Sequence, residues 1–257
     1  MSRLMRAAIL CVALAALTAP SSALADNYVA LGDSYSSGVG TNSYGLSSSC
    51  LRGVYAYPYL VAQQRPSTSL NFVACSGAVT TDVLNNQVSA VNSSTNIVSI
   101  TIGGNDAGFA STITACTLGG CTSQINAANS YIANTLPARL DAVYSQIETR
   151  SPAATVVVLG YPRLFNTSGC LGTTGISSAE RVSLNDTANR LDTAIAARAA
   201  AWGFTYKSAI TAFTGHAICS SSAWLNGLNI FNTTESFHPN RNGNSAGYAP
   251  LLRQVIG

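Results

Sequence analysis

Charged residues are scarce in this chain. Only 9% of its 257 residues are Asp, Glu, Lys or Arg, and Lys207 is the single lysine. Without Arg3 and Arg6 at the N-terminus, 11 basic and 10 acidic residues remain, a formal net charge of +1. A surface that binds nucleic acid needs a basic patch or stripe, and none is visible. We therefore expect no nucleic acid partner and a surface covered mainly by Ser, Thr, Asn and Gln.

Long apolar runs are also missing after residue 25. None reaches the roughly 18 residues that a membrane-spanning helix needs, so we expect no stable membrane span. At the N-terminus a short basic start precedes an apolar run over residues 7–17, and small residues follow up to Ala25. This order is typical of a secretory signal peptide. We predict a signal peptide over residues 1–25 and a secreted, extracellular, monomeric protein with a single domain over residues 26–257.

Cysteine, in contrast, is well represented in this chain. The six cysteines outside the predicted signal peptide are Cys50, Cys75, Cys116, Cys121, Cys170 and Cys219. An even number in an exported chain indicates disulfides, although six cysteines allow 15 pairings. We expect the sequential pairs Cys50–Cys75, Cys116–Cys121 and Cys170–Cys219. A metal site at Cys116 and Cys121 is the alternative, but no second cysteine pair or paired histidines lie at ligand spacing. We therefore expect no metal.

Strand-like apolar runs alternate with helical periodicity along the chain. Runs typical of strands cover residues 28–31, 71–75, 96–102, 155–160 and 204–209. Helices are predicted over residues 125–150 with a kink at Pro137, after a capping box at Ser177–Glu180, and over residues 248–256. Long polar connections are expected at residues 41–57, 107–124, 163–177 and 211–235. Strands that alternate with helices predict an α/β fold with a mostly parallel sheet.

Ser34 is the first candidate for a catalytic residue. It follows the predicted strand 28–31 in the order Gly32-Asp33-Ser34, which places its hydroxyl at the carboxyl edge of the sheet. Open α/β folds bind their ligands at that edge. A serine hydroxyl is a weak nucleophile until a base takes its proton, so Ser34 needs a partner.

The chain contains only two histidines that could be this base. His238 is followed by Pro239 and Asn240, which favour a turn, so its imidazole is expected on a loop. His216 lies three residues before a cysteine, and we expect a structural role for it. We therefore predict that His238 is the base.

Two further polar segments follow predicted strands. Gly103-Gly104-Asn105-Asp106 comes directly after residues 96–102, and the Asn105 side chain can donate a hydrogen bond to a developing negative charge. Gly77 follows the run 71–75, and a glycine allows its backbone N–H to approach a substrate closely. Each segment alone is common in turns. Together with a serine and a histidine they predict one site at the sheet edge.

These segments resemble, in their order, the sequence blocks of the SGNH (GDSL-type) hydrolase family, with Gly32-Asp33-Ser34-Tyr35, Gly77, Gly103-Gly104-Asn105-Asp106 and His238-Pro239 as the matching residues. The likeness covers residues 28 to about 252 and is greatest to secreted actinomycete lipases and esterases, whose three-disulfide pattern is also similar. It implies a three-layer, flavodoxin-like α/β/α sandwich. It implies Ser34 as nucleophile, His238 as base, and an oxyanion hole made by the Ser34 N–H, Gly77 and Asn105.

The residue that orients the histidine departs from this family pattern. The family usually has Asp three residues before the histidine, and here that position is Glu235. Some members of the secreted subgroup instead use a main-chain carbonyl two residues before the histidine, which would be that of Ser236. We favour this Ser–His dyad, with the Glu235 carboxylate as the alternative orienter or as a solvated loop residue.

A second serine motif is present near the C-terminus. Gly243-Asn244-Ser245-Ala246-Gly247 matches the Gly-x-Ser-x-Gly turn of α/β-hydrolases, but that fold needs a histidine after the serine, and none follows Ser245. Small residues that open a terminal helix explain the motif better.

The sequence thus predicts a secreted serine esterase or lipase without cofactors. Its substrate would be a lipid or small ester, such as an acylglycerol or a p-nitrophenyl ester of a fatty acid, cleaved through an acyl-enzyme on Ser34. A phospholipase A or a polysaccharide acetylesterase could use the same residues. A non-catalytic secreted binding domain is the alternative from another class. No apolar lid helix is visible, so we expect activity without interfacial activation.

Overall fold

The fold is built on one parallel sheet with the strand order β2-β1-β3-β4-β5. The computed structural model describes residues 25–257, so residues 1–24 of the predicted signal peptide lie outside the described residues. The strands are β1 (Asp26–Gly32), β2 (Thr68–Phe72), β3 (Ile97–Thr101), β4 (Thr155–Leu159) and β5 (Thr205–Lys207). Strand β1 lies between β2 and β3 and pairs with both, with Tyr28 opposite Leu70 and Ile97. The predicted parallel sheet is confirmed.

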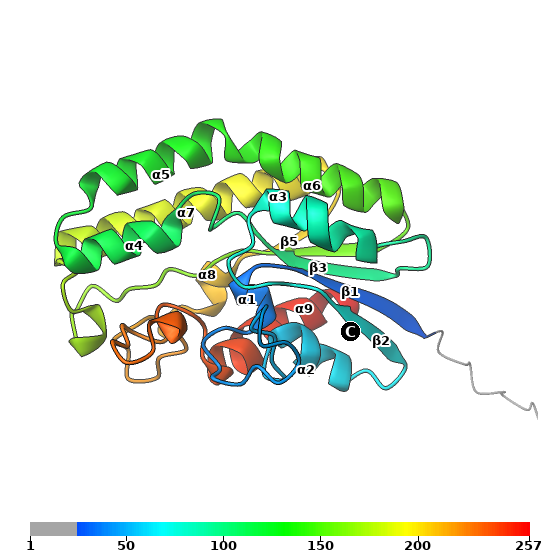
Figure 1. The fold of residues 1–257 in the computed structure, drawn as a ribbon, viewed down its shortest axis with the longest axis horizontal. Helices are drawn as coiled ribbons and strands as arrows, with labels where there is room; N and C mark the ends of the chain where they lie inside the picture. The colour runs from blue at the N-terminus through cyan, green and yellow to red at the C-terminus, as the bar shows by residue number, and fades with distance from the viewer. Residues whose placement is uncertain (1–24) are drawn as a thin grey trace, which may run out of the picture.

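Helices cover both faces of this sheet and form a three-layer sandwich (Figure 1). Along the chain the longer α-helices are α2 (Tyr57–Gln63), α4 (Phe109–Leu118), α5 (Thr122–Asn134), α6 (Leu136–Arg150), α7 (Ser178–Ala201) and α9 (Ala249–Ile256). The short helical segments are α1 (Ser34–Ser37), α3 (Thr80–Asp82), η1 (Val83–Gln87), η2 (Val88–Ala90), η3 (Leu171–Thr173), α8 (Ala209–Ala212), η4 (Thr233–Glu235) and η5 (Gly243–Tyr248). Helices α5, α6 and α7 lie on one side, and α2 and α9 on the other. The predicted α/β/α fold is therefore confirmed.

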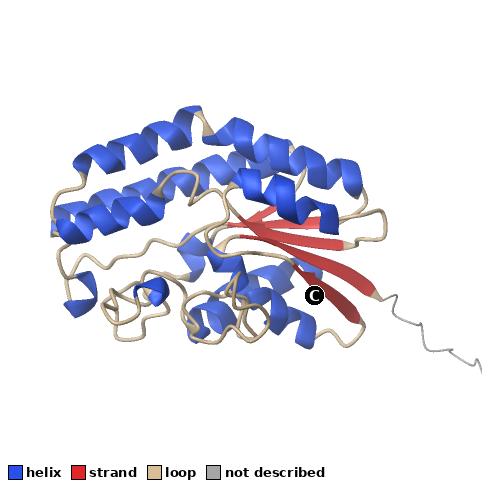
Figure 2. Ribbon diagram, in the orientation of Figure 1, coloured by secondary structure: helices blue, strands red, loops and turns tan. Residues whose placement is uncertain are grey.

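The core lies between these layers. The inner strands β1, β3 and β4 are buried almost throughout because helices pack on both of their faces. Loops gather at the carboxyl ends of the strands (Figure 2), and α1 starts there directly after β1. This end of the sheet is where the sequence places Ser34.

Most of the segment 107–124 is helical in the structure, and its prediction as a polar connection was wrong. It forms α4, whose Ile113 and Cys116 are buried. Its Thr side chains bond back within the helix: the Thr112 hydroxyl donates to the Gly108 carbonyl at 2.9 Å. Such internal bonds let a Ser- and Thr-rich sequence form a helix although it reads as a loop.

Two other boundaries differ from the sequence prediction. Residues 125–150 belong to two helices, α5 and α6, which are separated at Thr135 because Pro137 fits the first turn of a new helix better than the interior of a long one. Strand β2 ends at Phe72, before most of the predicted run 71–75. The rest of that run still lies alongside β1, because the Cys75 N–H donates to the Gly32 carbonyl at 3.0 Å.

Three disulfides join the cysteines as Cys50–Cys75, Cys116–Cys121 and Cys170–Cys219, in sequential order. The first and third connect loops at the carboxyl edge of the sheet, and the second closes the turn between α4 and α5. Long polar loops lose much conformational entropy on folding, and cross-links reduce that loss. Among residues 25–257, no helix has the length and apolar character needed to cross a membrane.

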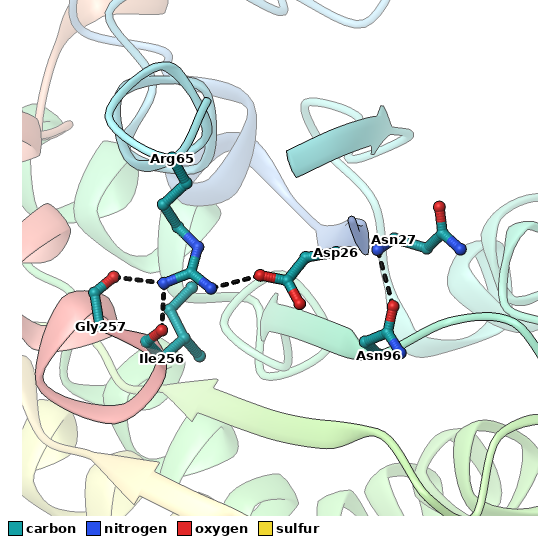
Figure 3. A network of polar contacts seen from close by, with 6 residues as sticks. All are labelled: Asp26, Asn27, Arg65, Asn96, Ile256 and Gly257. Atoms are coloured by element: carbon teal, nitrogen blue, oxygen red, sulfur yellow. Dashed lines mark hydrogen bonds and ion pairs between the residues drawn. The ribbon is translucent and has the colours of Figure 1, made fainter. Parts of the chain in front are cut away.

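Arg65 connects the two ends of the described chain at the amino edge of the sheet, the edge opposite to the one where Ser34 lies (Figure 3). Its guanidinium donates to the Asp26 carboxylate at the start of β1 and to the carbonyl oxygens of Ile256 and Gly257. The side chains of Arg65 and Asp26 are 22% and 29% exposed. The contacts hold α2, β1 and the end of α9 together.

Replacing Arg65 with Met should lower the free energy of unfolding by about 1–2 kcal/mol, because three acceptors would lose a charged donor in a partly buried place. Arg190→Met is the matched control, since the Arg190–Asp186 ion pair is more than half exposed and such pairs contribute about 0.5 kcal/mol or less. Urea unfolding of both variants measures the difference. Equal midpoints for the two would contradict the role given to Arg65.

Candidate active site

Ser34 lies at the point where β1 turns into α1. Gly32 has a φ of +124°, and a Cβ there would lie 2.4 Å from the Thr101 carbonyl oxygen, so only glycine fits beside β3. Asp33 then caps α1, with its carboxylate accepting the Tyr35 N–H at 2.9 Å. Ser34 follows as the first residue of the helix and is 6% exposed. The order Gly-Asp-Ser therefore has a local structural cause. The glycine allows β1 to approach β3 closely, the aspartate caps α1, and the serine is held at the edge of the sheet.

His238 faces this serine. Its Nε2 lies 2.9 Å from the Ser34 Oγ, and its Nδ1 lies 2.8 Å from the Ser236 carbonyl oxygen. A carbonyl oxygen can only accept, so Nδ1 carries the hydrogen of the neutral ring and Nε2 presents its lone pair to the Ser34 hydroxyl. This tautomer is the one that can take a proton from Ser34.

The surroundings of His238 favour its neutral form. Burial lowers the pKa of His238 to about 4, while hydrogen bonds to the backbone of Ser236 and Thr234 act in the opposite direction. The imidazole is therefore uncharged at neutral pH, and its Nε2 is available as a proton acceptor.

Asn226 holds the loop that carries His238. Its N–H donates to the His238 carbonyl at 2.9 Å, and its carbonyl accepts the Phe237 N–H at 3.0 Å. Its side-chain amide donates to the carbonyls of Gly40 at 2.8 Å and Glu235 at 3.1 Å. Phe237 has a φ of +62°, a left-handed conformation that a non-glycine residue adopts only when its surroundings enforce it. Sequence reasoning missed Asn226 because an asparagine in a polar loop carries no local signal.

Glu235 is buried, and its carboxylate is bound to the loop after α1. One oxygen accepts the hydroxyl of Tyr44, and the other accepts the Asn42 N–H at 3.1 Å. The carboxylate thus ties the loop after α1 to the loop before His238. The contact to the imidazole Nδ1 is made by the Ser236 carbonyl, which the sequence analysis favoured over the Glu235 carboxylate.

A buried polar network lies beneath Ser34. The Tyr161 hydroxyl donates to the Asp33 carboxylate and accepts the Gly104 N–H at 3.1 Å. Burial raises the pKa of Asp33 to about 7, against the hydrogen bonds from Tyr161 and the Tyr35 N–H, which lower it. Tyr161 thereby connects the end of β1 with the turn after β3. It was not among the predicted site residues, because it follows β4 with no motif around it.

Gly77 and Asn105 lie in the same pocket as Ser34 and His238. Gly77 has a φ of +80°, and no atom lies within 4 Å of the place a Cβ would take, so its backbone borders open space. The Asn105 amide donates to the Ala78 carbonyl at 3.0 Å, which fixes the side chain and uses one of its two hydrogens. The structure therefore brings all four predicted segments together at the sheet edge.

The pocket itself has a volume of about 490 Å³. Ser34, Gly77, Asn105 and His238 lie in its polar part. Helix α4 contributes Phe109, Ala110 and Ile113 to an apolar wall, which Leu228 and Phe237 extend. A pocket of this shape suits an apolar chain that ends in a polar group beside Ser34.

The remaining candidates lie outside this pocket. His216 places its Nδ1 2.6 Å from the Ser222 carbonyl oxygen and stacks on Trp224, with ring centroids 3.6 Å apart. Ser245 is exposed on η5, where the glycines of its motif pack closely: a Cβ at Gly247 would lie 2.5 Å from the Phe213 ring. Within residues 25–257 the one group with metal-ligand geometry is Cys116, Cys121 and Glu180. Its two cysteines are joined in a disulfide, so they offer no thiolates.

Comparison with known proteins agrees with this arrangement. Residues 30–246 match the model of the GDSL-like lipase/acylhydrolase family. "Lipase 1" of Streptomyces coelicolor is 50% identical over 236 residues, which cover 90% of this chain and 87% of that protein.

Two solved structures are also similar over nearly the whole described chain. An extracellular lipase of Streptomyces rimosus has a TM-score of 0.86 with 49% identity, over 90% of this chain and 100% of that one. A phospholipase A1 of Streptomyces albidoflavus NA297 has a TM-score of 0.86 with 48% identity, over 90% and 99%. The family match spans most of the chain and includes every segment of the pocket's polar part, so this chain belongs to the GDSL-like lipase/acylhydrolase family.

Proposed function

We propose that this protein is a secreted lipase or esterase that hydrolyses carboxylic esters of fatty acids through an acyl-enzyme on Ser34. The observation that carries the proposal is the 2.9 Å contact between the His238 Nε2 and the Ser34 Oγ at the polar end of an apolar pocket. Nucleophile and base within hydrogen-bond distance, with the base oriented by a third group, are the arrangement that nucleophilic catalysis by serine needs.

In the proposed reaction, His238 takes the Ser34 proton as the oxygen attacks the ester carbonyl. The negative charge that develops on the carbonyl oxygen is met by the N–H groups of Ser34 and Gly77 and by the Asn105 amide. Ser34 contributes its N–H because the first residues of a helix have no carbonyl partner within it. His238 then passes the proton to the leaving alcohol, and a water, activated by the same imidazole, cleaves the acyl-enzyme.

The proposed histidine partner is the Ser236 carbonyl rather than a carboxylate. A carbonyl oxygen fixes the tautomer and the ring orientation, but it carries no full charge to stabilise the imidazolium that forms during attack. Glu235 has a different part in this proposal: it positions the two loops that meet at His238.

A phospholipase A1 is the second candidate for the substrate class. Its support is the 48% identity to the phospholipase A1 of Streptomyces albidoflavus NA297, against 49% to the Streptomyces rimosus lipase. The pocket would receive an acyl chain in either case. Parallel rates on a triglyceride, on phosphatidylcholine and on acetylated xylan distinguish the lipase, phospholipase and acetylesterase proposals.

We also propose that residues 1–25 act as a secretory signal and that residues 26–257 form one secreted domain. Three disulfides support this, since they form and persist in oxidising compartments, and a similar protein is described as extracellular. The monomeric state remains a prediction.

Replacing Ser34 with Ala should reduce kcat/KM on p-nitrophenyl butyrate by about 10⁴-fold or more, because the acyl-enzyme can no longer form. The thermal unfolding midpoint should change little. Ser245→Ala is the matched control and should keep its full rate, since that exposed serine has no histidine partner. A rate near that of the unchanged protein in the Ser34 variant would disprove the mechanism.

The acid limb of the pH–rate profile should lie well below the ordinary histidine range. Burial lowers the pKa of His238 to about 4, so the neutral base persists as the pH falls through 6.5 and is lost near pH 4. NMR titration of the imidazole signals measures this directly, because the second histidine can be assigned with His216→Asn. Titration of His238 near pH 6.5 would contradict the prediction.

Replacing Glu235 with Gln should change kcat by less than about fivefold but lower the free energy of unfolding by about 1 kcal/mol, since its partners are Tyr44 and Asn42. Tyr44→Phe removes the hydroxyl donor alone and should behave similarly. If Glu235 instead oriented the imidazole, Glu235→Gln would cost kcat on the order of 10⁴-fold while Tyr44→Phe would not.

A further inference from the structure

Four large apolar side chains are almost fully exposed on segments next to the pocket. Leu118 is 83% exposed, Leu171 91%, Ile230 72% and Phe231 94%. Single exposed apolar residues are ordinary, whereas several of this size close together mark interaction sites. We call these four residues the apolar rim.

The segments that carry the rim adjoin the pocket and one another. Leu118 follows the pocket residue Thr117, and Ile230 and Phe231 follow the pocket residue Leu228. The Leu228 N–H donates to the Gly172 carbonyl at 2.8 Å, which places Leu171 beside the same loop.

The end of α4, which carries Leu118, also contacts the loop after η3. A Cβ at Gly175 would lie 2.2 Å from the Thr117 carbonyl oxygen, so the backbones of these two segments touch. Figure 1 shows the end of α4, η3 and η4 together on the left side of the molecule, beyond the carboxyl ends of the strands. The rim is therefore continuous with the mouth of the pocket.

The rim segments are free of charge. Residues 107–138, 164–179 and 208–234 contain no Asp, Glu, Lys or Arg. Attraction to an anionic membrane comes from Lys and Arg near the surface, and the rim segments themselves contain neither. Two charged side chains from α7 lie against these segments, one of each sign: the Glu180 carboxylate lies 3.4 Å from the Cys121 Sγ, and the buried Arg181 guanidinium donates to the Ile176 and Thr167 carbonyls. Four projecting apolar side chains without an excess of positive charge suit an interface whose own net charge is zero.

We propose that the apolar rim inserts into the surface of a zwitterionic phospholipid bilayer and holds the pocket mouth against it. This rests on the proposed function, since an acyl chain would pass from the bilayer between the rim residues to Ser34. The rim concentrates the protein at its substrate. Insertion of the rim does not have to open the pocket, because the pocket mouth is already accessible. Docking on a bilayer is therefore compatible with the absence of interfacial activation that the sequence predicts.

The test measures binding without turnover, on the full-length secreted protein with Ser34→Ala. Its partition onto phosphatidylcholine vesicles, measured by flotation, should fall by about a hundredfold or more when Ile230→Ser and Phe231→Ser are combined, because each buried side chain of this size contributes about a tenfold change in partition or more. Leu46→Ser is the matched control: Leu46 is 44% exposed in the loop beside Arg52. That variant should bind within twofold of its parent.

Salt provides a second readout. Raising the salt concentration about tenfold should leave the partition unchanged or strengthen it, since apolar insertion is not screened. In the active protein, the combined Ile230→Ser and Phe231→Ser change should leave kcat/KM on monomeric p-nitrophenyl acetate within twofold. The rate on phosphatidylcholine vesicles at low lipid concentration should fall in parallel with binding.

Three outcomes would overturn the proposal. The first is equal partition of rim and control variants. The second is binding that requires anionic lipid and disappears with salt. The third is a concentration-dependent dimer, seen by light scattering, that the rim variants abolish without changing the partition; it would assign the rim to a second copy of the chain. Failure of the proposed function is distinguishable, because the unaltered protein would then hydrolyse neither soluble nor vesicle esters, whereas partition of the Ser34→Ala protein does not depend on turnover.

Discussion

The hydrogen bond between Ser34 and His238 is the contact on which the site depends, and it joins residues 204 positions apart. Neither partner can be shifted by much more than an ångström without losing it. The serine is held by the end of β1 and the start of α1, both of which are constrained by the buried sheet. The histidine lies on a loop outside the sheet, so its position has to be supplied by side-chain and backbone hydrogen bonds.

Buried polar groups supply that position. Asn226 binds the backbone on both sides of the His238 loop and reaches back to Gly40 in the loop after α1. The Tyr35 hydroxyl also donates to the Phe237 carbonyl, at 2.8 Å. A buried polar group that lost its partner would cost about 1–3 kcal/mol, so each of these bonds resists movement of the histidine. The loop can therefore be irregular in sequence and still be well ordered.

The scarcity of charged residues affects both the stability and the surface of the loops around the pocket mouth. No ion pair between described residues lies in the loops around the pocket. Backbone and side-chain hydrogen bonds and disulfides hold these loops instead. The segments that carry the exposed apolar side chains beside the pocket contain no charged residue of their own. The composition noted first in the sequence is thus directly connected to the surface around the pocket mouth.

The sequence alone determined the parallel sheet, the family resemblance and the residue types gathered at the sheet edge, because each of these is encoded locally. Alternating apolar runs predict strands, and Gly-Asp-Ser is tied to the local turn from β1 to α1. The comparisons confirmed the family, and the fold confirmed the parallel sheet. The tertiary structure decided what depends on distant partners. Glu235 meets Tyr44, 191 positions away, and Tyr161 meets Asp33 across 128 positions. No local pattern encodes such pairs.

Helix α4 was missed for a related reason: its threonine hydroxyls are satisfied within the helix and its apolar face is defined only by the pocket that it lines.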